Sequence, residues 1–207
     1  MTVAERELTM PSVDRKADFS PHPYRWTREQ FYRMGEMGLL EGRRAILVEG
    51  EILAMPPMGD KHRTAIILGD EVLRRVFGEG FFVSVQCPFD IGEATDPEPD
   101  FAIVEGQARD FLGRGLTEAA LIVEISNTTY RYDRHEKASL YAKAGVPEYW
   151  IVNLDRQPAQ LEVHRAPRAD DAQPYGFGYA DVKTYSDGEI VQPLAASGQV
   201  AVSALLP

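Results

Sequence analysis

The feature that most constrains this fold is an apolar segment that carries one carboxylate. Residues 119–125 read Ala-Ala-Leu-Ile-Val-Glu-Ile, so nearly every side chain is apolar. Such a run is typical of a β-strand that is covered on both faces of its sheet. A buried carboxylate costs several kcal/mol unless it meets a cation or a hydrogen-bonding partner, so Glu124 indicates a charged site. The plainer alternative is a strand-end glutamate that pairs with a nearby arginine.

Periodic patterns on either side of this strand predict helices and further strands. Apolar residues recur at helical spacing over residues 62–77, and a second helix is predicted to start at Asp133, where Glu136 completes a capping box. A two-strand hairpin is expected over residues 45–55, turning at Glu49 and Gly50. Other strands are expected at residues 81–91, 100–105, 121–126, 149–154, 160–164, 179–185 and 189–191. The order predicts an α/β (α+β) fold with a mixed central sheet flanked by helices, an added N-terminal β-hairpin and added C-terminal strands.

Length and composition limit the domain organisation and the compartment. The 207 residues suffice for one domain, and we expect residues 1–25 to form a flexible N-terminal arm and residues 26–207 a single domain. A single cysteine, Cys87, excludes an intramolecular disulfide and a cysteine-based zinc site. The chain has no apolar run of the roughly 18 residues that a membrane span needs and no signal-peptide pattern at its start, so we expect a cytoplasmic protein.

The net charge of −10 argues against a general nucleic-acid coat protein. The acidity is local, because residues 45–110 hold 13 acidic and 5 basic side chains. This stretch includes Asp96-Pro-Glu-Pro-Asp100, which leads into the apolar strand after Asp100. The two prolines stiffen the approach, and two carboxylates at adjacent strand ends are ligands that Mg²⁺ accepts. The alternative is a simple acidic turn.

Several of these segments resemble a known family. Pro99-Asp100, followed 24 residues later by Glu124, is similar to the PD-(D/E)xK nuclease superfamily. Residues 123–129 and 132–153, the latter ending Lys-Ala-Gly-Val-Pro-Glu-Tyr-Trp-Ile-Val-Asn, resemble the Uma-two family of restriction-endonuclease-like bacterial proteins. The resemblance extends from about residue 26 to residue 164.

The resemblance implies a restriction-endonuclease-like core that hydrolyses DNA phosphodiester bonds with Mg²⁺ or Mn²⁺. Asp100, Glu124 and the main-chain carbonyl of Ile125 would hold the metal ion. Many enzymes of this architecture act as dimers, so the family also allows a homodimer.

One position departs from the superfamily pattern. A lysine is expected two residues after the glutamate, and Ser126 stands there. Ser126 shares a strand face with Glu124, but a hydroxyl supplies no positive charge. Lys137, 13 residues after Glu124, is our candidate for the catalytic lysine, reaching back from the second helix. The alternative is an ordinary helix lysine that points into solvent.

Other residues are candidates for supporting roles. Gln86, expected mid-strand, could orient water or substrate, although a glutamine bonded to the backbone is the simpler interpretation. His62 at a helix start could lie near the site or act in capping and packing. Glu49 in the hairpin is a further carboxylate, and Tyr141 lies on the same predicted helix face as Lys137.

The sequence thus predicts a metal-dependent endonuclease with catalytic residues Asp100, Glu124 and Lys137. A catalytically inactive nucleic-acid- or protein-binding module that keeps the nuclease fold is the alternative, and Ser126 motivates it. A hydrolase acting on RNA or another phosphate ester is a third interpretation, because one fold hosts many chemistries.

Overall fold

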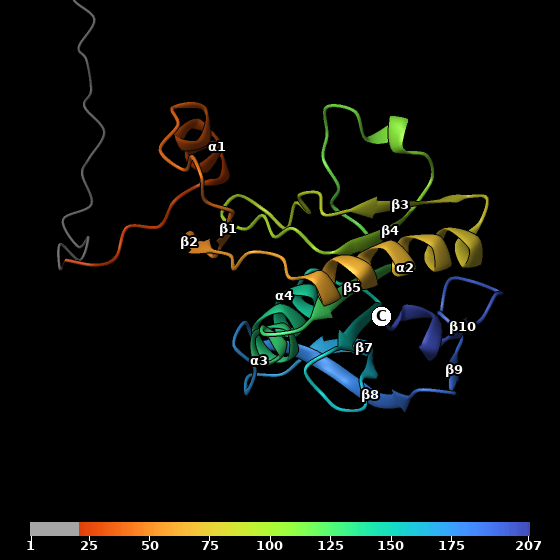
Figure 1. The fold of residues 1–207 in the computed structure, drawn as a ribbon. Helices are drawn as coiled ribbons and strands as arrows, with labels where there is room; N and C mark the ends of the chain where they lie inside the picture. Colours follow the sequence, from red (N-terminus) through yellow and green to blue (C-terminus); the bar gives the residue numbers. More distant parts are fainter. Residues whose placement is uncertain (1–20) are drawn as a thin grey trace, which may run out of the picture.

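The computed structural model describes residues 21–207, so most of the expected N-terminal arm lies outside the described residues. The chain forms a mixture of helices and strands, with most helices in the N-terminal two thirds and a run of strands at the C-terminal end (Figure 1). The helices are α1 (Arg28–Glu36), α2 (Asp60–Phe77), α3 (Tyr130–Tyr132) and α4 (Ala138–Lys143), with a π-helical turn (Asp133–Lys137) joining the last two. The strands are β1 (Ala45–Val48), β2 (Glu51–Ala54), β3 (Phe81–Val85), β4 (Phe101–Glu105), β5 (Leu121–Ser126), β6 (Glu148–Asn153), β7 (Gln160–Ala169), β8 (Phe177–Ser186), β9 (Ile190–Val191) and β10 (Val200–Ala201).

The centre of the fold is a mixed six-stranded sheet, with the strand order β3-β4-β5-β6-β7-β8. Strands β5 and β6 pair in parallel, and the other neighbouring pairs are antiparallel. The parallel pair requires a crossover, and the helical segment from α3 to α4 supplies it. The expected mixed sheet flanked by helices is confirmed.

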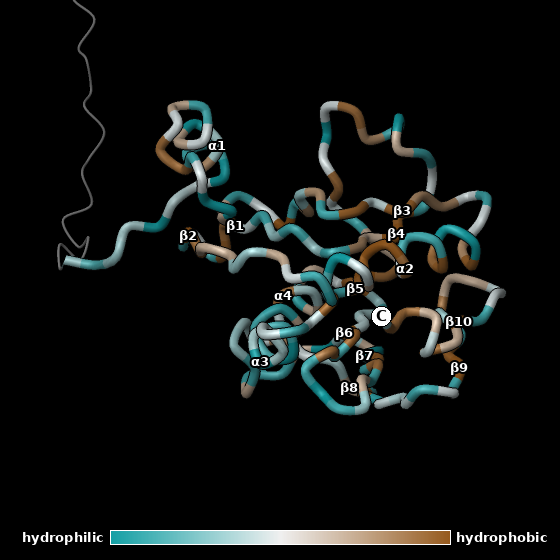
Figure 2. The backbone as a smooth tube through the Cα atoms, in the orientation of Figure 1, coloured by the Kyte–Doolittle hydropathy of each residue, from teal (hydrophilic) through white to brown (hydrophobic). Residues whose placement is uncertain are grey.

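Helices cover both faces of the sheet, which explains the continuous apolarity of β5. Leu121, Val123 and Ile125 belong to the core cluster under α2, whereas Ile122 packs with Tyr141 of α4. Figure 2 shows hydrophobic stretches of α2, β3 and β4 meeting near the middle of the molecule. Glu124 alternates with Val123 and Ile125, so it faces the α4 side. None of the helices within residues 21–207 has the length and apolarity to cross a membrane.

The N-terminal hairpin forms as expected, with a two-residue turn between β1 and β2. Both turn residues have positive φ, 47° at Glu49 and 78° at Gly50, which is the geometry that suits the twist of a tight hairpin. An isolated bridge between Leu47 and Asp96 ties the hairpin to the segment before β4. This contact brings the hairpin to the end of the sheet where β4 begins.

Several expected elements differ from those of the structure. The strand expected at residues 81–91 ends at Val85, because Gln86 has a φ of 50° that breaks the extended backbone. The second helix begins at Tyr130, so Asp133 is inside it rather than at a capping position. Strand β10 was not expected from the sequence, since its two residues give too short a pattern.

Close packing of α2 on the sheet generates a stability prediction. A Cβ at Gly69 would lie 2.8 Å from two ring atoms of the buried Phe101. We expect Gly69→Ala to lower the free energy of unfolding by about 1 kcal/mol, because overpacking outweighs the gain in helix propensity. Gly35→Ala in α1 is the control, since nothing lies within 4 Å of its Cβ position, and we expect it to be neutral or stabilising. Urea unfolding that finds Gly69→Ala as stable as the parent would contradict the packing argument.

Candidate active site

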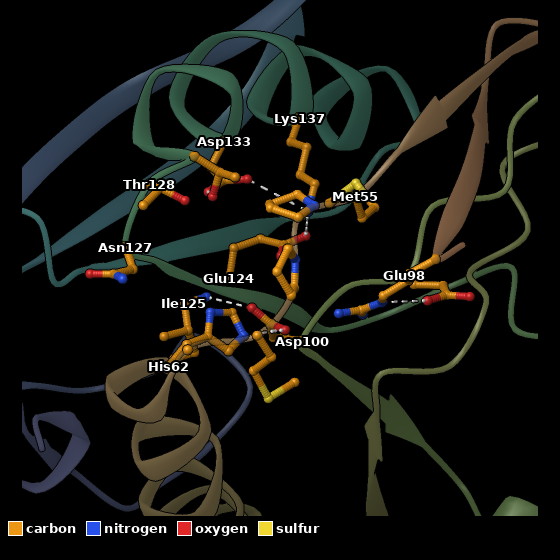
Figure 3. A pocket seen from close by; sticks show the side chains of 16 residues that line it. Met55, His62, Glu98, Asp100, Glu124, Ile125, Asn127, Thr128, Asp133 and Lys137 are labelled. Carbon is orange, nitrogen blue, oxygen red and sulfur yellow. Dashed lines mark hydrogen bonds and ion pairs between the residues drawn. The ribbon is translucent and has the colours of Figure 1, made fainter. Parts of the chain in front are cut away.

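A pocket of about 260 Å³ opens at the end of the sheet where β4 begins and β5 finishes. Its walls come from the hairpin side, the start of α2, the segment before β4, the end of β5 and the π-helical turn. Figure 3 shows Lys137 reaching down from the helix while His62 and Asp100 lie on the opposite side of the pocket. The residues that line it are Arg44, Met55, Pro56, Pro57, Met58, Gly59, His62, Glu98, Asp100, Glu124, Ile125, Asn127, Thr128, Thr129, Asp133 and Lys137.

Asp100 is buried, with 4% of its surface exposed, and three groups hold its carboxylate in place. Its Oδ1 lies 3.1 Å from His62 Nε2 and accepts a hydrogen bond of 3.1 Å from Gln86 Nε2. Its Oδ2 accepts a 2.8 Å bond from the Ile125 N–H. Burial would raise the pKa of Asp100, but these bonds and the charges of His62 and Lys137 hold it below its usual value. Asp100 is therefore a charged, oriented carboxylate.

The bond from Ile125 also fixes which way its carbonyl points. In a strand the N–H and the C=O of one residue point to the same neighbour. The Ile125 carbonyl therefore points to the β4 side of β5, toward Asp100. This position lies beyond Phe101 and Val123, the last residue pair of the two strands. A carboxylate and a main-chain carbonyl thus meet at one wall of the pocket.

Glu124 is 2% exposed and has two partners from the helix that follows β5. Its Oε1 lies 2.8 Å from Lys137 Nζ and accepts a 2.7 Å hydrogen bond from Tyr141 Oη. Burial raises the pKa of Glu124 to about 7, and the positive charge of Lys137 only partly opposes this effect. The carboxylates of Asp100 and Asp133 add to the rise, because like charges disfavour ionisation.

Lys137 is 4% exposed and is surrounded by carboxylates. Besides Glu124, it lies 3.5 Å from Asp133 Oδ1. Burial alone would lower its pKa, but Glu124, Asp133 and Asp100 hold the pKa of Lys137 above the ordinary lysine value. The ammonium therefore stays charged inside the pocket.

The donor set of this site fits a divalent cation. Asp100, Glu124 and Asp133 offer three buried carboxylates against a single buried ammonium, so negative charge is in excess. Within residues 21–207, no group of three His, Cys, Asp or Glu side chains is arranged to hold a metal ion, so a metal here would depend on two carboxylates and a main-chain oxygen. Two carboxylates and the Ile125 carbonyl are oxygen donors of the type that Mg²⁺ binds, with water completing its shell.

The structure brings together seven of the nine residues expected to hold the metal, act in catalysis or support the site. They are Asp100, Glu124, Ile125, Lys137, Gln86, His62 and Tyr141. Gln86 lies just after β3 rather than mid-strand, and its side chain bonds Asp100 instead of the backbone. Glu124 pairs with a lysine, so the alternative of a structural arginine pair was wrong.

Two expected supporting residues have no hydrogen bond or ion pair to Asp100, Glu124 or Lys137 in the described part of the chain. Ser126 is buried at the end of β5, and its Oγ has no hydrogen-bond partner among the described residues. Glu49 projects from the hairpin and pairs with Lys143 of α4 at 2.7 Å. Glu49 thus attaches the hairpin to α4 and is not a further ligand of the pocket.

Sequence reasoning missed Asp133, the third buried carboxylate that lines the pocket. Its signal was present as the spacing of four residues to Lys137, which places two oppositely charged side chains side by side on a helix. Asp133 also fits a capping box with Glu136, and the sequence prediction placed it at the helix start for that reason.

The comparisons with known proteins agree with this fold. A family model named Uma2 and described as "Putative restriction endonuclease" matches residues 28–203. A crystal structure described as a "putative nuclease belonging to DUF820" from Anabaena variabilis ATCC 29413 is 16% identical, covers 86% of this chain and 96% of its own, and superposes with a TM-score of 0.63. No curated protein matches the chain. The match over residues 28–203 establishes that this chain belongs to the Uma2 family of restriction-endonuclease-like proteins.

Proposed function

We propose that this protein is a divalent-metal-dependent endonuclease that hydrolyses DNA phosphodiester bonds. The observation that carries the proposal is the pair of buried carboxylates, Asp100 and Glu124, at neighbouring strand ends beside a buried lysine. Burial of this much charge has a large desolvation cost, and structures retain such charge mainly at functional sites. Family membership supports a nuclease-like function.

Asp100, Glu124 and the Ile125 carbonyl would hold Mg²⁺ or Mn²⁺ in this proposal. A bound ion of this kind polarises a phosphodiester and lowers the pKa of a water molecule that attacks it. The chain's own residues prepare the ligands. His62 and Gln86 fix Asp100, and Tyr141 fixes Glu124 through its hydroxyl.

Lys137 would supply positive charge at its Nζ, where charge develops on the phosphoryl oxygens during hydrolysis. It takes the role of the lysine that Ser126 replaces, but from the helix rather than from β5. Because Lys137 is buried, its ammonium is held in place and needs little reorganisation when substrate binds. The position of the charge supports a catalytic rather than a surface role.

A catalytically inactive module with the same fold is the competing function, and Ser126 is the observation that favours it. A screen for cleavage of single-stranded, double-stranded and branched DNA with Mg²⁺ or Mn²⁺ separates the two functions. DNA binding without turnover under either ion would support the inactive module, and cleavage of RNA alone would indicate a different phosphodiester substrate.

Substitution of either metal-binding carboxylate tests the site. We expect Asp100→Asn and Glu124→Gln each to lower Mn²⁺-dependent DNA cleavage by about 100-fold or more, because a bound metal supplies several kcal/mol of transition-state stabilisation. Asp181→Asn and Glu71→Gln remove exposed carboxylates of β8 and α2 and are the matched controls, with activity near that of the parent. Cleavage that survives both site substitutions at parental rates would refute the assignment.

The raised pKa of Glu124 predicts how metal affinity depends on pH. A carboxyl group with a pKa of about 7 is largely protonated at pH 6, and a metal ion must displace that proton. We therefore expect Mn²⁺ affinity to rise by roughly tenfold per pH unit below pH 7 and to level off above it. Isothermal titration calorimetry from pH 5.5 to 8.5 measures this, and an affinity that is flat across the range would contradict it.

Net charge predicts how DNA binding depends on salt and on metal. The acidic residues around the pocket repel a phosphate backbone until a cation offsets them. We expect weak binding of a slowly cleaved phosphorothioate duplex in chelator, tighter binding with Mg²⁺, and an affinity that falls steeply with salt. Fluorescence anisotropy measures all three, and tight binding in chelator at high salt would contradict the electrostatic argument.

A further inference from the structure

Asp133 has an unusual environment for an aspartate. It is 2% exposed and lines the pocket. Its Oδ2 accepts a 2.6 Å hydrogen bond from Thr129 Oγ1, whereas its Oδ1 has no hydrogen-bond partner among residues 21–207. The nearest cation to Oδ1 is Lys137 Nζ, at 3.5 Å. A buried carboxylate with a hydrogen bond to only one of its oxygens is costly, which indicates that Oδ1 has a functional role.

The ammonium of Lys137 is shared between two carboxylates. It lies at 2.8 Å from Glu124 Oε1 and at 3.5 Å from Asp133 Oδ1, so Glu124 holds it more closely. Within the described part of the chain, Lys137 is the one cationic side chain at ion-pair distance from either group. Figure 3 shows Lys137 between Asp133 and Glu124, with a dashed line to each.

The π-helical turn explains why this helix can present three side chains to one strand. Asp133, Lys137 and Tyr141 are spaced by four residues, and in a regular α-helix eight residues drift by about 80° around the axis. A π-helical turn contains more residues than an α-helical turn, so each residue rotates less around the axis and the three side chains stay closer to one face. The turn spans Asp133 to Lys137, and both Lys137 and Tyr141 reach the same oxygen of Glu124.

We propose that Asp133 is a positioning residue that keeps the Lys137 ammonium in the pocket when Glu124 binds a metal ion. This inference rests on the proposed function. A cation on Glu124 competes with Lys137 for the same carboxylate and repels the ammonium. Asp133 Oδ1 is then the acceptor that remains within a short movement of Nζ, fixed from behind by Thr129. Without it, metal binding would expel the lysine that the reaction uses.

The ammonium resonance of Lys137 gives a readout that does not depend on activity. The other described lysines, Lys61, Lys143 and Lys183, are exposed, so their ammonium protons exchange fast with water. A buried ammonium exchanges slowly and gives an observable ¹H–¹⁵N signal, which Lys137→Met assigns by its disappearance. In the parent protein we expect the signal to persist, with a changed shift, when Mg²⁺ is added. Loss of the signal in Mg²⁺-loaded parent protein would overturn the proposal without any Asp133 variant.

The Asp133→Asn variant separates this role from simple structural support. In the metal-free variant Glu124 still holds Lys137, so we expect the signal to remain and to disappear when Mg²⁺ binds. Asp181→Asn is the control and keeps the signal in both states. A signal that persists in the Mg²⁺-loaded Asp133→Asn protein would refute the role, whereas parent protein that binds no Mg²⁺ would refute the proposed function and, with it, this inference.

Kinetics provide the matching functional test. We expect Asp133→Asn to lower kcat on DNA by about 10–100-fold with little change in KM, as for other residues that orient a catalytic group. In the Lys137→Met background the same substitution should have less than about a twofold effect, because residues that act through one another are not additive. An equal loss in both backgrounds, or a weaker Mn²⁺ affinity like that of Glu124→Gln, would make Asp133 a structural residue or a metal ligand instead.

Discussion

The buried ion pair between Lys137 and Glu124 is the interaction on which the site depends. It joins the middle strand of the sheet to the helix that follows it, across 2.8 Å. Neither group is stable alone in this environment, since each would lose its solvation without compensation. The pair therefore fixes the position of the helix over β5, and Tyr141 and Asp133 extend the same contact along the helix.

The end of the β4–β5 ladder positions the Asp100 side of the site. Strand β4 pairs with β5 only as far as Phe101 and Val123, so the next groups along both strands are free of the ladder. The Asp100 side chain therefore accepts a hydrogen bond from the Ile125 N–H, which in a longer ladder would bond to the main chain of β4. Gln86, in a left-handed conformation after β3, turns its amide to the same carboxylate, and such backbone positions concentrate at functional sites.

Local patterns were sufficient to predict most of the sheet and the main site residues. The apolar run around Glu124 and the periodicity of α2 depend on burial alone, which the sequence records directly. The start of the second helix was wrong because Asp133 fits a capping position locally, whereas its carboxylate serves a contact inside the helix. The partners of Asp100 come from residues 62, 86 and 125, and such long-range contacts leave no periodic signal in a single sequence.

Gly69 has no side chain, and this connects the packing of the core to the geometry of the pocket. Gly69 lets α2 lie against Phe101, and His62 is two turns earlier on the same face of that helix. Phe101 directly follows Asp100, the partner of His62. The separation between helix and strand at residue 69 therefore influences the distance between Asp100 and His62, which lies seven residues before Gly69 on the helix. Close packing of the core thus helps to set the geometry of the carboxylate in the pocket.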